Sequence, residues 1–195
     1  MPGNTGAETR VSSKDNLDQR SDIDLIADIN RGDAAAFEVL YFRYRDWVVA
    51  QAGRFTGDTS SALDVMQETF LYVLRKFPGF RLTANFKTFL YPAVRNLSIA
   101  ARRKSARYQS NDGEQLALEN TAAPAVPLSG NEELTAILAP LSEEHREVLL
   151  LRFVDGLSLA EIATAMEIPV GTVKSRMHNA LETLRNDPRT KELFE

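Results

Sequence analysis

A segment near the C-terminal end, residues 156–176, constrains the fold most, because its sequence predicts two short helices joined by a tight turn. Ser158 and Glu161 have the Ser-x-x-Glu spacing of a capping box, in which each side chain accepts the other residue's backbone N–H. Pro169 marks the turn, because the residue before a proline is disfavoured in the helical conformation. Two cations follow in the second helix. The segment therefore predicts a helix-turn-helix, whose second helix can enter a DNA major groove. A plain packing corner with solvated cations is the alternative.

Apolar residues recur at helical spacing through the rest of the chain, and no stretch has a convincing strand pattern. Caps and breakers bound the elements, with Asp33 at a helix start and Gly57 at a helix end. In the first predicted helix we expect Ile23, Ile26 and Ile29 to face the core. Helices are predicted over about 22–31, 34–56, 60–76, 86–103 and 132–138, followed by one that Ser142 opens and by the helix pair.

The predicted fold class is all-α, with two small helical domains. Residues 1–20 are poor in apolar side chains and are predicted to form a disordered N-terminal extension. Residues 105–131 are rich in small and polar side chains, contain prolines and lack an amphipathic period, which predicts a flexible linker. The first domain is predicted over 21–104 and the second over 132–195.

Composition argues against several classes of function. The chain of 195 residues has no cysteine and two histidines, so no catalytic site, cofactor or metal site is expected. No apolar run of about 18 residues is present, so no membrane span is predicted, and the polar N-terminus lacks the apolar core of a signal peptide. An enzyme is the weakest hypothesis, because the turn over 169–172 is too poor in glycine for a phosphate loop.

The net charge of −4 does not exclude a nucleic-acid partner, because the charges are unevenly distributed. The segment 95–107 contains arginines and a lysine but no acid. Charges act over about 10 Å at moderate salt, so a locally basic surface can still bind phosphates.

Two predicted helices carry faces suited to partners. In the third helix, acids, an amide and a leucine lie opposite the apolar face, which suits a protein interface; a solvated stripe is the alternative. In the fourth, cations, a hydroxyl and a tyrosine form one ridge, which suits phosphate contact and base stacking; a solvated basic face is the alternative. The first face contains Asp64, Gln67, Glu68, Leu71 and Arg75, and the ridge contains Lys87, Tyr91, Arg95, Ser98 and Arg102.

Three segments together resemble the sigma-70 family of bacterial transcription initiation factors, in particular its extracytoplasmic-function group. Residues 64–70 (DVMQETF) are similar to the family's core-polymerase-binding motif. Residues 86–91 (FKTFLY) are similar to the segment that opens and reads the minus-ten element, and 156–176 to the minus-thirty-five reader. The three occur in the family's order and spacing and span both predicted domains.

The resemblance implies a role for each set of residues. The loop over 80–85 would receive a base flipped from the non-template strand, with Asn85 as a polar reader. The core-polymerase residues would be Asp64, Gln67, Glu68, Phe70 and Leu71; the minus-ten residues Phe80, Asn85, Lys87, Tyr91, Arg95, Asn96, Arg102 and Arg103; and the minus-thirty-five residues Thr172, Lys174, Ser175, Arg176 and Asn179.

The resemblance also implies partners and a mechanism. The partners would be bacterial core RNA polymerase, promoter DNA and an anti-sigma factor that covers the third and fourth helices. The protein would be a dissociable specificity subunit without chemistry of its own, located in the cytoplasm at the nucleoid or held at the membrane by the anti-sigma factor. Two departures from the family pattern affect the DNA contacts: Pro92 and Ala93 replace a basic-aliphatic pair, and Asn179 replaces a frequent arginine.

Two other functions remain open from the residues alone. A conventional helix-turn-helix repressor or activator would leave the partner face of the third helix and the long linker unexplained. A sigma-mimicking regulator that binds an anti-sigma factor without contacting DNA would not need the basic ridge, Lys174 or Arg176.

Overall fold

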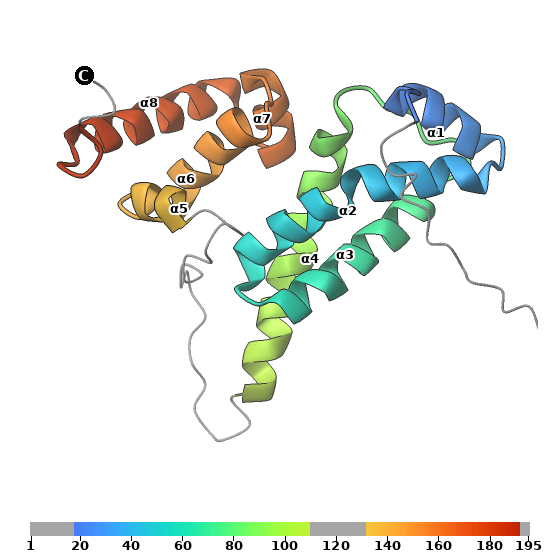
Figure 1. The fold of residues 1–195 in the computed structure, drawn as a ribbon, viewed down its shortest axis with the longest axis horizontal. Coiled ribbons are helices and arrows are strands. Elements are labelled where there is room, and N and C mark those ends of the chain that lie inside the picture. The colour runs from blue at the N-terminus through green and yellow to red at the C-terminus, as the bar shows by residue number, and fades with distance from the viewer. Residues whose placement is uncertain (1–17, 110–131, 192–195) are drawn as a thin grey trace, which may run out of the picture.

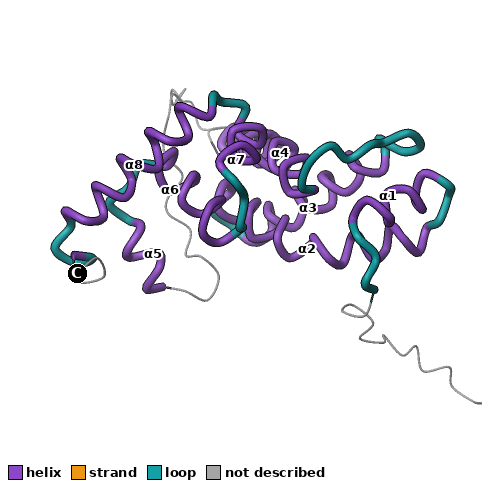
Figure 2. Tube along the Cα trace, turned by 90° about the horizontal axis from the view of Figure 1, so that it is seen from above, coloured by secondary structure: helices purple, strands orange, loops and turns teal. Residues whose placement is uncertain are grey.

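The computed structural model describes residues 18–109 and 132–191, and every element in these ranges is helical (Figure 2). The all-α class with two helical domains is confirmed. Most of the predicted N-terminal extension and linker lies outside the described residues. The first domain consists of α1 (Asp22–Asn30), α2 (Ala34–Thr56), α3 (Thr59–Leu74) and α4 (Phe86–Gln109), and the second of α5 (Glu132–Leu138), α6 (Glu143–Leu149), the π-helical turn η1 (Leu150–Val154), α7 (Leu159–Met166) and α8 (Val170–Asn186).

The helices begin at the caps that the sequence indicates. Ser21 opens α1 and Ser158 opens α7, each through a capping box, and the Glu161 carboxylate accepts the Ser158 N–H at 2.8 Å. Asp33 accepts two backbone N–H groups at the start of α2. Gly57 ends that helix with a φ of 84°, a left-handed conformation that glycine adopts without a Cβ clash.

In the first domain α2, α3 and α4 pack on one another, and α1 packs on α2 (Figure 1). The inward residues of α1 are Leu25, Ile26 and Ile29. The expectation that Ile23 faces the core is wrong, since its side chain is 66% exposed. Helical geometry explains the difference, because at about 100° per residue Ile23 is rotated by about 160° from Leu25 and by about 120° from Ile29.

The second domain contains the predicted helix-turn-helix, formed by α7 and α8, and α6 packs on α8. Glu167, in the turn, has a φ of 56° and is the one non-glycine residue with positive φ in the described ranges. The second domain lies against the first, with α7 packed on α4. The faces of α4 and α7 therefore meet in the molecule.

Candidate functional site

The outward face of α3 is the first part of the candidate site. As predicted, it exposes Asp64, Gln67, Glu68 and Leu71. Leu71 is 44% exposed, and the neighbouring Leu63 and Leu74 are exposed to a similar extent. Leucines that remain at the surface beside acids and an amide suit a protein partner, because their burial on binding is favourable.

Phe70 does not share this exposure, although the motif suggested a direct contact with a partner. Its side chain is 4% exposed, and its ring packs edge-on against Phe37 and Tyr41, with 4.7 Å between the centroids of the Phe70 and Tyr41 rings. One helical step separates an inward Phe70 from an outward Leu71. Phe70 therefore fixes the position of α3 in the core and offers no surface to a partner.

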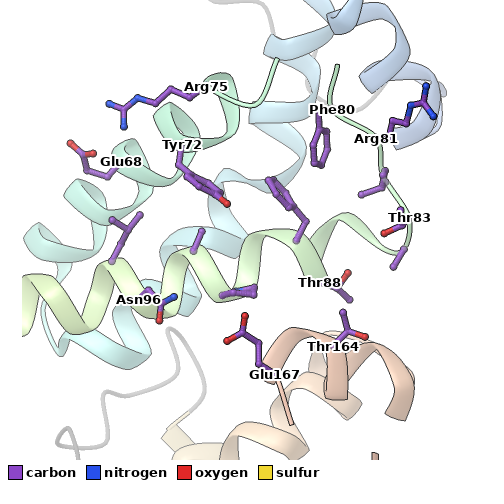
Figure 3. Close-up of a pocket in the computed structure, with 16 residues that line it drawn as sticks. Glu68, Tyr72, Arg75, Phe80, Arg81, Thr83, Thr88, Asn96, Thr164 and Glu167 are labelled. Atoms are coloured by element: carbon purple, nitrogen blue, oxygen red, sulfur yellow. The ribbon is translucent and has the colours of Figure 1, made fainter. Parts of the chain in front are cut away.

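An open pocket of about 610 Å³ lies between α3, the loop before α4, and α4 itself (Figure 3). Aromatic rings form one wall: Tyr72 stacks on Phe89 with centroids 5.8 Å apart, and Phe80 is tilted against Phe89 at 4.5 Å. Arg75 and Asn96 add polar edges. A pocket of this volume, with an aromatic wall and polar side chains around it, suits a flat ligand such as a nucleobase.

Asn30, at the end of α1, fixes the loop that carries Phe80. Its Oδ1 accepts the N–H groups of Gly79 at 2.6 Å and Phe80 at 3.1 Å, and its Nδ2 donates to the Phe80 carbonyl at 2.8 Å. Neither Asn30 nor Tyr72 was among the predicted site residues. An amide at a helix end and a tyrosine on a mixed helix face are compatible with many roles, so only the fold identifies them.

The predicted ridge of α4 is partly covered by the second domain. Lys87 donates from Nζ to the Asp155 carbonyl at 3.0 Å, and Arg95 lies 3.5 Å from the Glu147 carboxyl group. Tyr91 is fully buried, and its hydroxyl binds the same carboxyl group. The expected exposure of Tyr91 is therefore wrong for this arrangement, because its ring joins an apolar cluster that spans both domains.

The other predicted minus-ten residues lie outside this contact. Asn96 is exposed and lines the pocket, and on the later turns of α4 Arg103 is exposed and Arg102 half-buried. Asn85 is exposed, but its Oδ1 accepts the Lys87 backbone N–H at 2.9 Å. This bond caps the start of α4, which gives Asn85 a structural role in addition to any contact that its amide nitrogen makes.

The helix α8 presents the predicted minus-thirty-five residues. Lys174, Ser175 and Asn179 are exposed, and Thr172 is half-buried. The guanidinium of Arg176 lies 2.8 Å from the carboxylate of Glu144, whose side chain is 63% exposed. An ion pair with so exposed a partner contributes only about 0.2–1 kcal/mol. A phosphate group can therefore compete with Glu144 for Arg176.

Asp155, which follows η1, is the centre of the polar contacts between the domains. Its carboxylate accepts from Trp47 Nε1 at 2.6 Å and from Gln51 Nε2 at 2.9 Å, and Arg54 lies 3.7 Å away. Trp47 and Gln51 are 108 and 104 residues distant in the chain. No local sequence pattern can indicate such a contact, and Asp155 was not among the predicted residues.

Glu147 is a second buried acid at this boundary. Burial raises its pKa to about 7, and the positive charge of Arg176 partly opposes that rise. The acid is therefore largely protonated below neutral pH while it stays buried, and in that form its carboxyl group can share a proton with the Tyr91 hydroxyl.

No group of three or more histidine or acidic side chains in the described ranges is placed to hold a metal ion. None of the helices in those ranges is long and apolar enough to cross a bilayer.

Comparison with known proteins adds an independent line of support. The family model described as sigma-70 region 2 matches residues 40–108, and the model described as sigma-70 region 4 matches residues 137–186. The RNA polymerase sigma-H factor of Pseudomonas aeruginosa is 32% identical over 86% of this chain and 94% of that protein. The extracytoplasmic-function sigma-E factor of Escherichia coli is 33% identical over 87% of this chain and 95% of its own length. SigW of Bacillus subtilis is 29% identical over 84% and 95%.

Two solved structures resemble the fold. CnrH in complex with the cytosolic domain of CnrY has a TM-score of 0.59 and 25% identity, over 84% of this chain and 94% of that one. The sigma factor RpoE of Bartonella quintana, in complex with the anti-sigma factor NepR, has a TM-score of 0.57 and 24% identity, over 76% and 94%, and shows likeness of fold alone.

Proposed function

The chain belongs to the sigma-70 family, in its extracytoplasmic-function group, and we propose that it acts by binding alone, as the subunit that directs core RNA polymerase to a set of promoters. It is an alternative sigma factor for transcription initiation. Three surfaces would carry this function, one for the polymerase and two for DNA, and the residues of each are part of the proposal.

The polymerase surface is the outward face of α3. Exposed acids beside exposed leucines at Leu71 and Leu74 support this assignment. Acids would give the contact its orientation through charge complementarity with basic side chains of the polymerase, and leucine burial would contribute affinity. An anti-sigma factor that covers α3 and α4 would compete with the polymerase for the same face.

The minus-ten surface is the aromatic pocket with the adjoining part of α4. A base flipped out of the duplex would enter between Phe80, Tyr72 and Asn96, and Arg102 and Arg103 would contact the backbone beside it. Strand separation would follow from preferential binding of unstacked bases, since unstacking costs a few kcal/mol per step. The pocket with its aromatic wall is the observation that carries this part of the proposal.

The minus-thirty-five surface is the start of α8. Lys174 and Ser175 are exposed there, and the ion pair of Arg176 is with the solvated acid Glu144. Placed in the major groove, this helix would read base edges and phosphates over about one turn of duplex.

Run-off transcription with purified core enzyme tests the function directly. The templates would be start sites mapped after overexpression of this chain. We expect specific transcripts only when the protein is added, whereas transcripts no more abundant than those of core alone would refute the proposal. A helix-turn-helix repressor would instead bind a palindromic site as a dimer, and a sigma mimic would bind an anti-sigma factor without supporting any transcript.

A further inference from the structure

The outward side of α8 can be located from the residues that the helix buries. Val173, Ala180 and Leu184 are its buried residues, and they pack into the two apolar clusters of the second domain. At about 100° per residue these three side chains fall within about 40° of one another around the helix axis. The helices α6 and α7 pack on α8 and lie between most of it and the first domain (Figure 1). The side of α8 opposite the buried residues is therefore the surface that a DNA duplex can approach.

His178 lies close to the middle of this outward side. The direction opposite the buried residues passes between Ser175, about 20° away on one side, and His178, about 40° away on the other. Both residues are exposed, and the side chain of His178 is 78% exposed. Lys174, also exposed, lies next to His178 around the helix. His178 was not among the predicted minus-thirty-five residues, although its position on the helix is as favourable as that of Ser175.

Arg176 lies on the flank of α8 instead. It is rotated by about 120° from the middle of the outward side and is half-buried. Its guanidinium is directed toward α6, where it pairs with Glu144 at 2.8 Å. From this position the side chain reaches phosphates at the edge of a groove more readily than base edges at its floor. The base edges are therefore closer to Ser175 and His178.

The dimensions of the major groove allow His178 to act together with the residues of the preceding turn. A helix rises about 1.5 Å per residue, so the four steps from Lys174 to His178 cover about 6 Å. The major groove is about 12 Å wide and can hold both turns at once. Gly171, on the same side one turn earlier, places no side chain between the helix and the DNA. The first turn of α8 can therefore approach the duplex closely, which brings His178 toward the base edges.

The imidazole of His178 can donate a hydrogen bond to a base. Its Nε2 lies 3.9 Å from the carboxylate of Glu182, one turn further along α8. Because an ionised carboxylate only accepts hydrogen bonds, this nitrogen is the one that carries a hydrogen. The Glu182 side chain is 61% exposed, so the contact is weak and an acceptor on a base can replace it. Guanine presents two such acceptors, N7 and O6, in the major groove.

We propose that His178 is a specificity-determining residue of the minus-thirty-five surface, and that its Nε2–H donates to N7 or O6 of a guanine in the major groove. This inference rests on the function proposed above. In the free protein the same nitrogen faces Glu182, and on binding it exchanges the carboxylate for the base.

Run-off transcription at limiting holoenzyme, formed from core enzyme and this chain, tests whether His178 reads a base. The templates would carry every single base-pair substitution in a mapped minus-thirty-five element. With the wild-type protein we expect one position of the element to prefer guanine about tenfold over the other bases. His178→Ala should reduce this preference to about twofold or less and leave the preferences at distant positions unchanged.

His178→Gln gives a sharper test, because an amide side chain pairs bidentately with N6 and N7 of adenine. The preferred base at the same position should change from guanine to adenine, which a residue with a purely structural role would not cause. The matched control is His145→Ala, which removes the other histidine of the chain, in α6, and should keep the base preferences of the wild type.

Equal base preferences in wild type and His178→Ala at every position would overturn the inference. A loss of activity in His178→Ala by the same factor on all templates would also overturn it, because a uniform loss indicates a phosphate contact. Specific transcripts with unchanged preferences would refute this inference alone. A wild-type holoenzyme that yields no specific transcript would refute the proposed function, and this inference with it.

Discussion

The carboxyl group of Glu147 is buried between the domains. Tyr91 and Arg95 face it from α4, and Arg176 faces it from α8. Because its pKa is raised to about 7 from a reference of 4.5, the buried group keeps a proton between these values that an exposed group has released. The state that buries Glu147 therefore loses stability as pH rises through this window. In the free protein we expect acrylamide quenching of Trp47 to increase from about pH 5 to about pH 7.5 and to level off above it.

This pH dependence needs a control that removes the ionisable group itself. Glu147→Gln keeps the shape of the side chain and removes its ionisation. Quenching in Glu147→Gln should be nearly independent of pH. A pH dependence that survives in this variant would assign the effect to another group.

Arg176 and Glu144 give a second prediction for single residues. Arg176→Ala should weaken binding to a mapped minus-thirty-five duplex by about 1–3 kcal/mol if the guanidinium reads a base edge. Glu144→Ala should strengthen binding slightly, because it frees Arg176 for DNA. Fluorescence anisotropy at several salt concentrations measures both, and an Arg176→Ala loss that is equal on all sequences would indicate a phosphate contact instead.

Among the elements, α3 carries the prediction for the polymerase. Leu71→Ala and Asp64→Ala should each weaken core binding about tenfold, since a few residues that become fully buried carry most of the binding free energy of an interface. Glu38→Ala, which removes an exposed acid from α2, is the matched control and should bind core like wild type. Surface-immobilised core enzyme measures the affinities. Wild-type affinity in both α3 variants would place the polymerase contact elsewhere.

The loop between α3 and α4 depends on Asn30 for its position. Asn30→Ala removes three hydrogen bonds to Gly79 and Phe80 and should lower the free energy of unfolding by about 1–3 kcal/mol in urea titrations. Because the aromatic wall of the pocket loosens, transcription from duplex templates should fall more than transcription from premelted ones. Asn30→Asp keeps the acceptor oxygen and should have a smaller effect on both.

How far the sequence predicts this fold depends on the range of the interaction. Capping residues such as Ser21 and Ser158 act within one turn, so the helix starts follow from local patterns. Helical spacing also indicates the outward face of α3. It misassigns Ile23 and Tyr91, because burial of a mixed face depends on which element packs against it. The Asp155 contacts join residues 104 and 108 positions apart and have no local signature at all.

For the whole molecule, the contact between the two domains bears on core affinity. If core binds the domains apart, part of the binding free energy is used to separate them, and the measured affinity is lower than that of the separated form by the fraction of molecules in that form. Asp155→Ala should therefore bind core more tightly than wild type, and transcription at limiting protein should rise. Titration of run-off product against protein concentration measures the shift, and an unchanged midpoint would mean that core does not have to open the protein.

Glu167 affects both the backbone of the helix-turn-helix and the access of a ligand to the pocket. Its positive φ costs a residue with a side chain about 1–2 kcal/mol relative to glycine, and its carboxylate lines the pocket from the second domain. Substitution at this turn should therefore move two properties in the same direction: Glu167→Gly is expected to melt at a higher temperature and also to admit an anionic strand more readily. Substitutions that raise thermal stability often reduce ligand access. At this turn one substitution would improve both.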